Sequence, residues 1–342
     1  MAKAVKMADI AKVMGVSTVT VSKALSNQKG VSEELRIKIK QQAEKMGYRT
    51  NSAVYQERIK NSVSYNIGVI VSDGFLDQYQ SFYWKLYQEV ATVAVQKGCF
   101  TMLEVLQQEV EEKCEMPKLL QEKRVDGVVV IGLLKEEYLQ KLNEYTEIPV
   151  IYLDFYDKNK ECDSVVSNNY FGMYKLTNYL FQNGHREIAF VGNVLFTGSI
   201  TDRYFGYVKS LYEHGIEVRK DWVLDDRDAI TGDMEDGLEI VLPKEMPTAF
   251  VCNCDVTAGN LIRKLKENGY RVPEDISVVG YDNYQPPGLS EVAITSYDVD
   301  MREMAKRTVR NIIKKISGEH YKQGVAVVTG HIEYKDSVAP RK

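Results

Sequence analysis

Aromatic rings, carboxylates and arginines recur in the polar segments that follow the apolar runs of this 342-residue chain. The most aromatic segment is Ser72–Trp84, and the others are Asp154–Tyr156, Gly192–Arg203, Arg227–Asp228, Asn253–Asp255 and Asp282–Tyr284. Rings can cover the C–H face of a sugar, while carboxylates, amides and a guanidinium form strong hydrogen bonds with its hydroxyls. These residue types therefore favour reversible binding of a small, hydroxyl-rich molecule.

Motifs for covalent or metal chemistry are absent from the sequence. We find no phosphate-binding glycine loop, no H-E-x-x-H zinc motif and no G-x-S-x-G nucleophile elbow. Asp225 and Asp226 are adjacent, so their side chains would point to opposite faces of a strand. This spacing does not indicate a pair of catalytic carboxylates. Cys252 and Cys254 are isolated from the 4 histidines, and the 5 cysteines contain no C-x-x-C pair. We therefore expect a protein that is not an enzyme and that uses no cofactor or metal.

Strands and helices that would position these residues alternate from Tyr65 onward. Short apolar runs predict strands at 65–71, 100–105, 127–131 and 149–154, separated by helices at 82–97, 116–122 and 138–145. A second series begins at 165–166, with strands at 187–191, 222–224, 249–252 and 277–280 and helices at 172–182, 202–214, 235–241 and 256–268. This alternation predicts parallel sheets whose ligands lie at the carboxyl ends of the strands.

The opening segment has a different pattern. Apolar residues at helical spacing around Ile10 precede Gly15, after which Ser17 can cap a second short helix. Ser32 can cap a third helix, which Gly47 would end. A second helix that enters the DNA major groove would present small or polar side chains, so we assign DNA contact to Ser17, Thr18, Val19, Thr20, Ser22, Lys23 and Asn27. The alternative is a helical hairpin with a solvated face.

Charge separates this opening segment from the remainder. Residues 1–62 carry a net charge of +7, and the remaining residues carry −11. A basic module on an acidic body is typical of a DNA-binding headpiece, because neutralised phosphates release counterions. The sequence contains neither an apolar run that could span a bilayer nor a hydrophobic signal core at its start, so we expect a cytoplasmic protein without membrane contact.

Several motifs together resemble the LacI/GalR family of bacterial transcription regulators. They are Asp9–Ala11, Gly15–Ser17, Thr20–Leu25, Val31–Ser32, Gly47–Arg49, Ile67–Ile70, Val125–Gly127, Gly184–Ile188 and Val272–Asp282. The resemblance implies an α/β protein with an all-α helix-turn-helix headpiece at 1–50, a hinge at 51–64 and a periplasmic-binding-protein-like body at 65–342. In that body, one subdomain would comprise 65–160 and 295–320, and the other 161–294 and 321–338.

The resemblance also assigns residues to an effector site between the subdomains. Arg203 and Asp282 match the pair that holds the effector in many relatives, and Ser199 and Asp228 match positions that face it. Phe75, Tyr79 and Phe82 would belong to the first-subdomain wall, and Asp154 is a further candidate because it follows the strand predicted to end at Leu153. Asp255 matches a residue at the cleft, although Cys254 replaces a frequent Asn beside it.

The hinge departs from the family pattern. In relatives a short hinge helix inserts an apolar side chain into the minor groove, and here the segment contains Asn51, Val54, Tyr55 and Glu57. Glu57 occupies the wedge position, and Thr50 stands where the family has a proline. A carboxylate is disfavoured in a groove lined by acceptors. Either Tyr55 or Ile59 supplies the wedge instead, or the kink is weak.

The resulting interpretation is a homodimeric transcription regulator, most often a repressor in this family, that binds pseudo-palindromic double-stranded operator DNA. A small-molecule effector, expected to be a carbohydrate, would control operator affinity. A nucleobase or other metabolite effector is the alternative. A solute-uptake protein or a carbohydrate enzyme fits less well, because neither predicts the basic headpiece.

Overall fold

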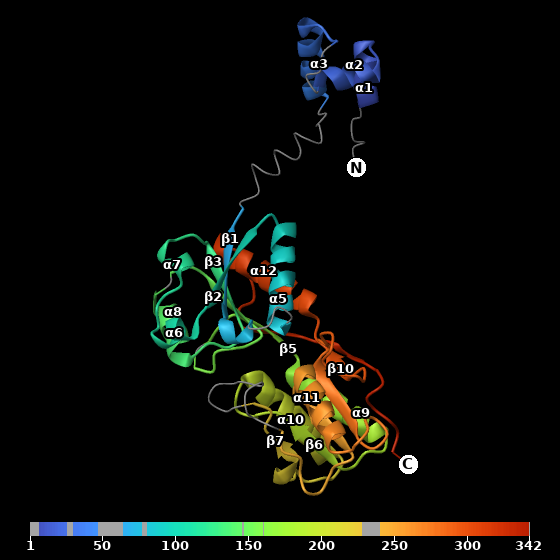
Figure 1. The fold of residues 1–342 in the computed structure, drawn as a ribbon. Coiled ribbons are helices and arrows are strands. Elements are labelled where there is room, and N and C mark those ends of the chain that lie inside the picture. Colours follow the sequence, from blue (N-terminus) through green and yellow to red (C-terminus); the bar gives the residue numbers. More distant parts are fainter. Residues whose placement is uncertain are drawn as a thin grey trace. The chain divides into compact units, whose positions relative to one another are not determined.

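The computed structural model describes residues 7–25, 30–46, 64–76, 81–145, 147–159, 161–227 and 240–341. The chain forms two units, Met1–Ser64 and Tyr65–Lys342 (Figure 1). We call them the headpiece and the body. No helix among these residues is long and apolar enough to cross a membrane.

The headpiece contains three helices, α1 (Met7–Met14), α2 (Thr18–Leu25) and α3 (Glu33–Lys45). Gly15 has a φ of 62°, and this left-handed conformation lets the chain turn sharply between α1 and α2. The Ser17 Oγ accepts a hydrogen bond from the Thr20 amide at 3.1 Å, as the capping prediction requires. The small core consists of Ile10, Ala11, Val21, Ala24, Ile39 and Ala43.

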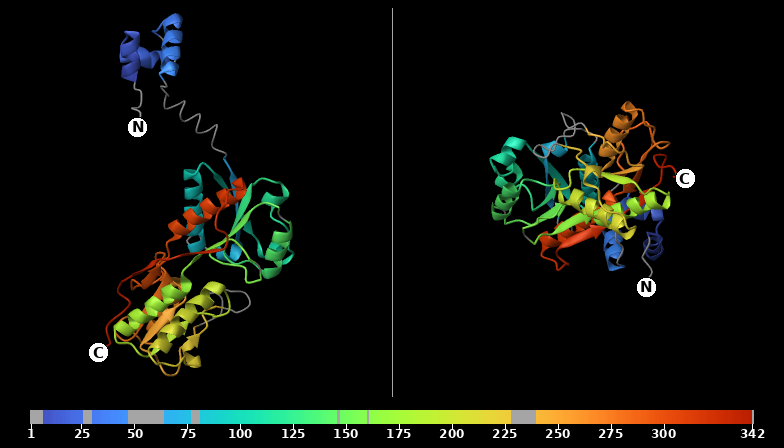
Figure 2. Two further views of the ribbon diagram at one scale, coloured as in Figure 1. Left: turned by 180° about the vertical axis from the view of Figure 1, so that it is seen from behind. Right: turned by 90° about the horizontal axis from the view of Figure 1, so that it is seen from below.

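The body contains two six-stranded sheets with helices on both faces of each, so the predicted α/β class is confirmed (Figure 2). In the first sheet the strand order is β11 (Val325–Val328), β5 (Ser164–Ser167), β4 (Val150–Leu153), β3 (Gly127–Ile131), β1 (Asn66–Ser72) and β2 (Phe100–Leu106). All of its pairings are parallel. We call this sheet and its helices the first lobe.

Alternating side chains of these strands pack against different helices. Val69 and Val129 belong to the core beneath α5 (Phe82–Gln96) and α12 (Met301–Ser317). Ile70 and Val130 instead join the core that includes α7 (Lys118–Gln121) and α8 (Glu136–Tyr145). Short elements complete this lobe, namely the 3-10 helix η1 (Asp73–Phe75) and α6 (Gln108–Glu112). Successive side chains of a strand point to opposite faces of the sheet, and both faces are buried here. These strands therefore appear in the sequence as continuous apolar runs.

The second lobe contains the other sheet, whose order is β12 (His331–Glu333), β10 (Thr295–Asp298), β9 (Ser277–Asp282), β8 (Ala249–Cys252), β6 (Ile188–Val191) and β7 (Val223–Leu224). Only the β10–β12 pairing is antiparallel within this described sheet. Helices α9 (Asn169–Gln182) and α10 (Gly198–Glu213) pack on one face, α11 (Asp255–Glu267) packs on the other, and η2 (Lys220–Trp222) precedes β7.

The subdomain boundaries implied by the resemblance need correction. Residues from 161 were assigned to the second subdomain, but β5 pairs with β4 and β11 in the first sheet. Residues from 295 were assigned to the first, but β10 pairs with β9 in the second. Within 321–338, β11 lies in the first sheet and β12 in the second. The chain therefore crosses between lobes at 168, at 299–300 and at 329–330. The helix expected at 235–241 falls almost entirely outside the described residues.

Helices α9 and α10 approach each other closely at Gly206. A Cβ built there would lie 2.2 Å from the Tyr170 carbonyl oxygen and 2.9 Å from the Tyr174 backbone nitrogen. Both obstacles are backbone atoms, so a larger residue would force the helices apart. This contact fixes the position of α10, which carries Arg203 one turn earlier.

We predict that Gly206→Ala lowers the free energy of unfolding by about 1–3 kcal/mol, because overpacking outweighs alanine's better helix propensity. Chemical denaturation would measure the change. Gly198→Ala is the matched control, because a Cβ there comes no closer than 3.6 Å to its nearest neighbour. Equal stability of Gly206→Ala and wild type would show that the helices can separate at no cost.

Candidate functional site

The exposed face of α2 carries the residues assigned to DNA contact. Val21 and Ala24 face the headpiece core, whereas Ser17, Thr18, Val19, Ser22 and Lys23 are exposed and Thr20 is half-buried. Val19 is 60% exposed although it is apolar, so headpiece folding does not explain its identity. Asn27 lies outside the described residues, as do the hinge candidates Asn51, Val54, Tyr55 and Glu57.

Arg36 of α3 holds the end of α2 in place. Its side chain is buried and donates from Nη1 to the carbonyl oxygens of Lys23 at 3.3 Å and Ala24 at 3.4 Å. Its Nη2 donates to the Val31 carbonyl at 3.4 Å. The last carbonyls of a helix lack partners within the helix, so one guanidinium satisfies them and fixes the orientation of α2. The sequence analysis did not identify this residue.

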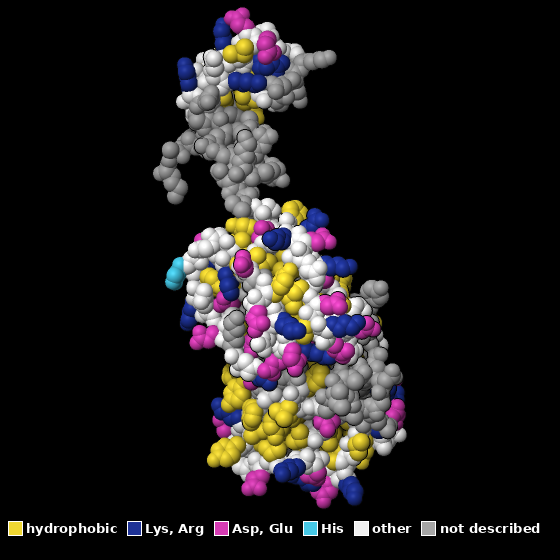
Figure 3. All heavy atoms as spheres, turned by 90° about the vertical axis from the view of Figure 1, so that its left-hand side faces the viewer, with side chains coloured by type: hydrophobic (Ala, Val, Ile, Leu, Met, Phe, Trp, Pro, Cys, Tyr) yellow, Lys and Arg dark blue, Asp and Glu magenta, His cyan; other side chains and the backbone are white. Residues whose placement is uncertain are grey.

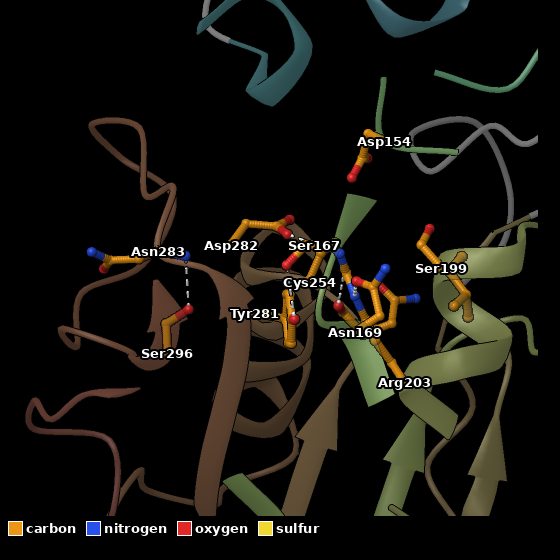
Figure 4. A network of polar contacts seen from close by, with 12 residues as sticks. Asp154, Ser167, Asn169, Ser199, Arg203, Cys254, Tyr281, Asp282, Asn283 and Ser296 are labelled. Atoms are coloured by element: carbon orange, nitrogen blue, oxygen red, sulfur yellow. Dashed lines mark hydrogen bonds and ion pairs between the residues drawn. The ribbon is translucent and has the colours of Figure 1, made fainter. Parts of the chain in front are cut away.

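A second candidate site lies where the two lobes meet. A small cavity of about 30 Å³ is lined by residues of both lobes, namely Tyr83, Leu133, Asp154, Phe155, Tyr156, Val166, Asn169, Thr197, Gly198 and Ser199. Figure 4 shows Asp154 directed from the first lobe toward Arg203 and Asp282 of the second. Asp154 follows β4 and Asp282 ends β9, so both lie at carboxyl ends of parallel strands, as predicted for ligand-facing residues.

Arg203 is the centre of the second-lobe part of this site. Its Nε donates to the Asn169 Oδ1 at 2.9 Å, and its Nη1 donates to the Asn253 carbonyl at 2.6 Å. Its Nη2 lies 3.2 Å from the Asp282 Oδ1, and the guanidinium lies 3.8 Å from the centre of the Tyr281 ring. Arg203 and Asp282, which the resemblance paired, are therefore in direct contact.

The two carboxylates are buried in strained backbone conformations. Asp154 has a φ of 70° and Asp282 a φ of 97°, a region that aspartate tolerates better than most residues. Burial raises the pKa of Asp282 to about 7, despite the attraction of Arg203. Burial likewise raises the pKa of Asp154 to about 6. Both groups can therefore exchange protons near neutral pH.

Asp154 keeps acceptor capacity for a ligand. Its Oδ2 accepts a hydrogen bond from the Tyr83 hydroxyl at 3.2 Å. Its Oδ1 is buried and accepts no hydrogen bond from the described residues. Burial, followed by the nearby Asp154 charge, holds the pKa of Tyr83 well above its usual value, so this phenol remains a donor. An unsatisfied buried acceptor beside a cavity is costly unless a donor reaches it.

A buried ion pair supports Arg203 from behind. The Asp226 carboxylate accepts from the Arg227 guanidinium at 2.7 Å, from the Thr257 hydroxyl at 2.6 Å and from the Asn253 side chain at 2.7 Å. Burial would raise the pKa of Asp226, but these donors hold it below its usual value. Because Asn253 is fixed in this way, its carbonyl oxygen is positioned for Arg203.

Asp255 and Cys254 occupy supporting positions at the start of α11. The Cys254 Sγ accepts from the Thr257 amide at 3.5 Å and so acts as the helix cap. Asp255 is buried against Gly280, where a Cβ would lie 2.0 Å from the Asp255 Oδ1. Burial and the neighbouring Asp282 charge hold the pKa of Asp255 well above its usual value. Asp255 is not among the residues that line the cavity, and neither are Arg203 and Asp282, which lie beside it through Asn169 and Asp154.

The remaining effector candidates do not all line the cavity. Ser199 lines the cavity, whereas Phe75 and Phe82 support it indirectly by packing against Tyr83, with ring centres 4.6 and 5.3 Å apart. Tyr79 and Asp228 lie outside the described residues. Tyr83, Tyr156 and Asn253 lie in segments that the sequence analysis singled out but were not among the assigned effector residues, and Asn169 was missed. Each lies within one or two residues of a candidate or strand end, which is the signal that could have identified it.

Comparisons with known proteins match both parts of the chain. The profile described as "Bacterial regulatory proteins, lacI family" matches residues 6–51, and the profile "Periplasmic binding protein-like domain" matches 177–338. The HTH-type transcriptional repressor PurR of Pasteurella multocida is 28% identical over 338 residues, which cover 97% of this chain and 98% of that protein. PurR of Aliivibrio salmonicida is 25% identical over 331 residues, covering 96% and 98%.

Solved structures share the fold over nearly the whole chain. The transcriptional regulator CelR in complex with cellobiose has a TM-score of 0.68 at 22% identity and covers 97% of this chain and 99% of its own. The lac repressor dimer bound to operator and the anti-inducer ONPF has a TM-score of 0.66 at 23% identity, covering 98% and 100%. With the helix-turn-helix, the two-lobed body and both profile matches, this chain belongs to the lacI family of bacterial regulatory proteins and is a DNA-binding transcription regulator.

Proposed function

We propose that this protein is a repressor whose affinity for operator DNA is controlled by a neutral, hydroxyl-rich effector, a carbohydrate, bound between the two lobes. The observation that carries this proposal is that Asp154 of one lobe and Asp282 of the other both face the junction, where Arg203 contacts Asp282. Three of the five N–H donors of Arg203 already have protein partners, and its positive charge is paired with Asp282, which disfavours an anionic ligand.

The carboxylates of the site indicate which kind of effector it would bind. Carboxylates accept hydrogen bonds, and the free Oδ1 of Asp154 needs a donor such as a hydroxyl. The rings of Tyr83 and Tyr156 line the same cavity and can cover an apolar face. Anions would meet two carboxylates and are disfavoured. The cellobiose complex of CelR is a precedent on this fold.

A nucleobase is the second candidate effector. It would offer N–H donors to the same carboxylates and a flat face to Tyr83 or Tyr156. Thermal-shift titration of the purified protein with a panel of sugars and nucleobases separates the two, because a ligand that binds the native state raises its melting temperature. A shift with nucleobases and none with sugars would replace the carbohydrate proposal.

Control of DNA binding would follow from the relative orientation of the lobes. An effector that contacts Asp154 in one lobe and Asp282 in the other favours the orientation that brings both within reach. It can regulate only by its preference for that orientation, and coupling of about 1–3 kcal/mol is typical. The Tyr156 hydroxyl, 3.5 Å from the Asp202 Oδ2, adds a further contact between lobes that the same movement would change.

We infer that the regulator acts as a homodimer through the edge of the first sheet. Edge strand β2 exposes Phe100 at 61% and Met102 at 40%, and neighbouring α5 exposes Val95 at 62%. Exposed apolar edge strands are templates for further association unless they are protected. A two-fold axis would place two headpieces on the half-sites of a pseudo-palindrome.

Lys23→Ala should weaken binding to the cognate operator more than binding to random duplex, because an exposed α2 side chain can reach base edges. Fluorescence anisotropy at several salt concentrations would measure both affinities. Lys38→Ala is the control, since Lys38 lies on α3 and already pairs with Glu34 at 2.7 Å. Equal losses on both duplexes would limit Lys23 to a phosphate contact.

Effector affinity should increase as the pH rises from about 5 to about 8. The pKa values of Asp154 and Asp282 are raised to about 6 and about 7, so both lose their protons in this window and become stronger acceptors. Calorimetry with the effector found by thermal shift would measure the slope. Asp282→Asn should abolish the effector response while operator binding persists. Asp221→Asn, at an exposed carboxylate of the same lobe, should change neither. An unaltered response of Asp282→Asn would exclude Asp282 from the site.

Phe100→Glu should disrupt the dimer, because a carboxylate on the apolar edge would be buried without a partner. Sedimentation velocity of the full chain would measure the mass. Tyr145→Glu is the control, since Tyr145 is 53% exposed on α8, away from β2. Unchanged association of Phe100→Glu would remove β2 from the interface.

A further inference from the structure

The outer face of the second lobe carries large aromatic side chains that the proposed effector and DNA functions do not use. Helices α9 and α10 expose Tyr170 at 40%, Phe171 at 41%, Phe205 at 53% and Tyr212 at 83%. Figure 3 shows hydrophobic side chains gathered on this lobe. We call these four residues the aromatic face.

Side-chain contacts link the α9 rings of this face to α10. The Lys209 ammonium lies 5.7 Å from the ring centre of Tyr170 and 4.8 Å from that of Tyr174, which bridges α10 to α9. The Phe171 and Tyr174 rings stack with centres 6.1 Å apart. The Tyr174 hydroxyl donates to the Glu213 carboxylate at 2.7 Å. The rings are therefore held in place by neighbouring side chains of both helices.

Folding of the lobe does not account for these residues. The core-facing sides of α9 and α10 are supplied by other residues, including Met173, Leu176, Tyr207 and Leu211. At these exposures, the four aromatic side chains present about 400 Å² of surface. A patch of this size on a monomer often marks an interaction site, and aromatic residues are enriched at interface cores.

The charges on the aromatic face favour a second copy of the same chain as its occupant. Lys175 lies 5.8 Å from the Phe171 ring centre, and Lys209 lies 3.7 Å from Glu213, so both signs are present within one patch. A two-fold contact places a surface on itself and requires such self-complementarity. There the Lys209 ammonium of one copy can meet the Glu213 carboxylate of the other. A strongly acidic or basic partner would match only half of these charges.

The aromatic face could form the apolar core of an interface between copies. Standard interfaces bury roughly 800 Å² on each partner, with an apolar core and a polar rim. The aromatic face supplies about half of that area as core. Lys175, Lys209 and Glu213 would supply the rim. Tyr212, with its side chain mostly in solvent, is suited to insert into the opposite surface.

We propose that two copies associate through their α9–α10 aromatic faces about a two-fold axis, which joins the dimers formed through β2 into tetramers. The tetramer requires both interfaces and therefore depends on the proposed β2 dimer. The contact between the aromatic faces does not depend on that dimer. The two interfaces lie on different lobes, so single substitutions can remove them separately.

Sedimentation velocity of the full chain over a concentration series tests this proposal. Wild type should reach the mass of four copies, Tyr212→Glu and Phe100→Glu should each stop at two, and the double variant should remain at one. Tyr145→Glu should behave as wild type. Circular dichroism would check folding, which Tyr212→Glu should preserve because Tyr212 is 83% exposed.

A charge exchange at the same face provides a second test. Lys209→Glu should reduce assembly beyond the dimer, and adding Glu213→Lys should restore it by exchanging the signs. Wild type that stops at two copies and is unaffected by Tyr212→Glu would overturn the aromatic contact. If Phe100→Glu then gave monomers, the β2 dimer would still stand. If Tyr212→Glu instead reduced a dimer to monomers, the aromatic contact would stand and the β2 dimer would fail.

Discussion

The buried guanidinium of Arg203 is the interaction on which the body's site depends. A charge withdrawn from water is stable only when it is paired and hydrogen-bonded. Here the partners come from the start of α9, the end of β8 and the end of β9, through Asn169, Asn253 and Asp282. One side chain therefore ties together three elements that are distant in sequence. Stacking on Tyr281 covers its remaining face.

This arrangement also explains the unusual state of the carboxylates. Arg203 can balance one negative charge, yet Asp154 faces the same junction from the other lobe. Burial of both acids therefore favours their protonated forms at a pH where exposed aspartates are ionised. The proposed effector would supply hydrogen-bond donors at this junction, because such a ligand stabilises the charged forms without adding charge of its own.

The sequence predicts local elements well because their causes are local. Gly15, Ser17 and the spacing of apolar residues define the helix-turn-helix, and uninterrupted apolar runs identify the buried strands. Arg203 and Asp282 could be paired only through the family resemblance. Which sheet β10 or β11 joins depends on long-range pairing, and an apolar run of four residues carries no signal for its neighbour. Tyr83 and Asn253 lie in segments that the sequence indicated, but their individual roles could not be assigned, because these roles arise from contacts with residues far away in the chain.

The short connections between the lobes constrain how the body can move. The links at 168, at 299–300 and at 329–330 are one or two residues long, and Asn168 donates to the Thr329 hydroxyl at 3.3 Å, which joins two of them side by side. Sliding or wholesale separation would stretch every link at once. Bending at these links stretches them less than sliding does, and displacement then grows with distance from the links. The links would thus act as a hinge, at which a small change of angle produces a larger displacement at the far ends of the lobes.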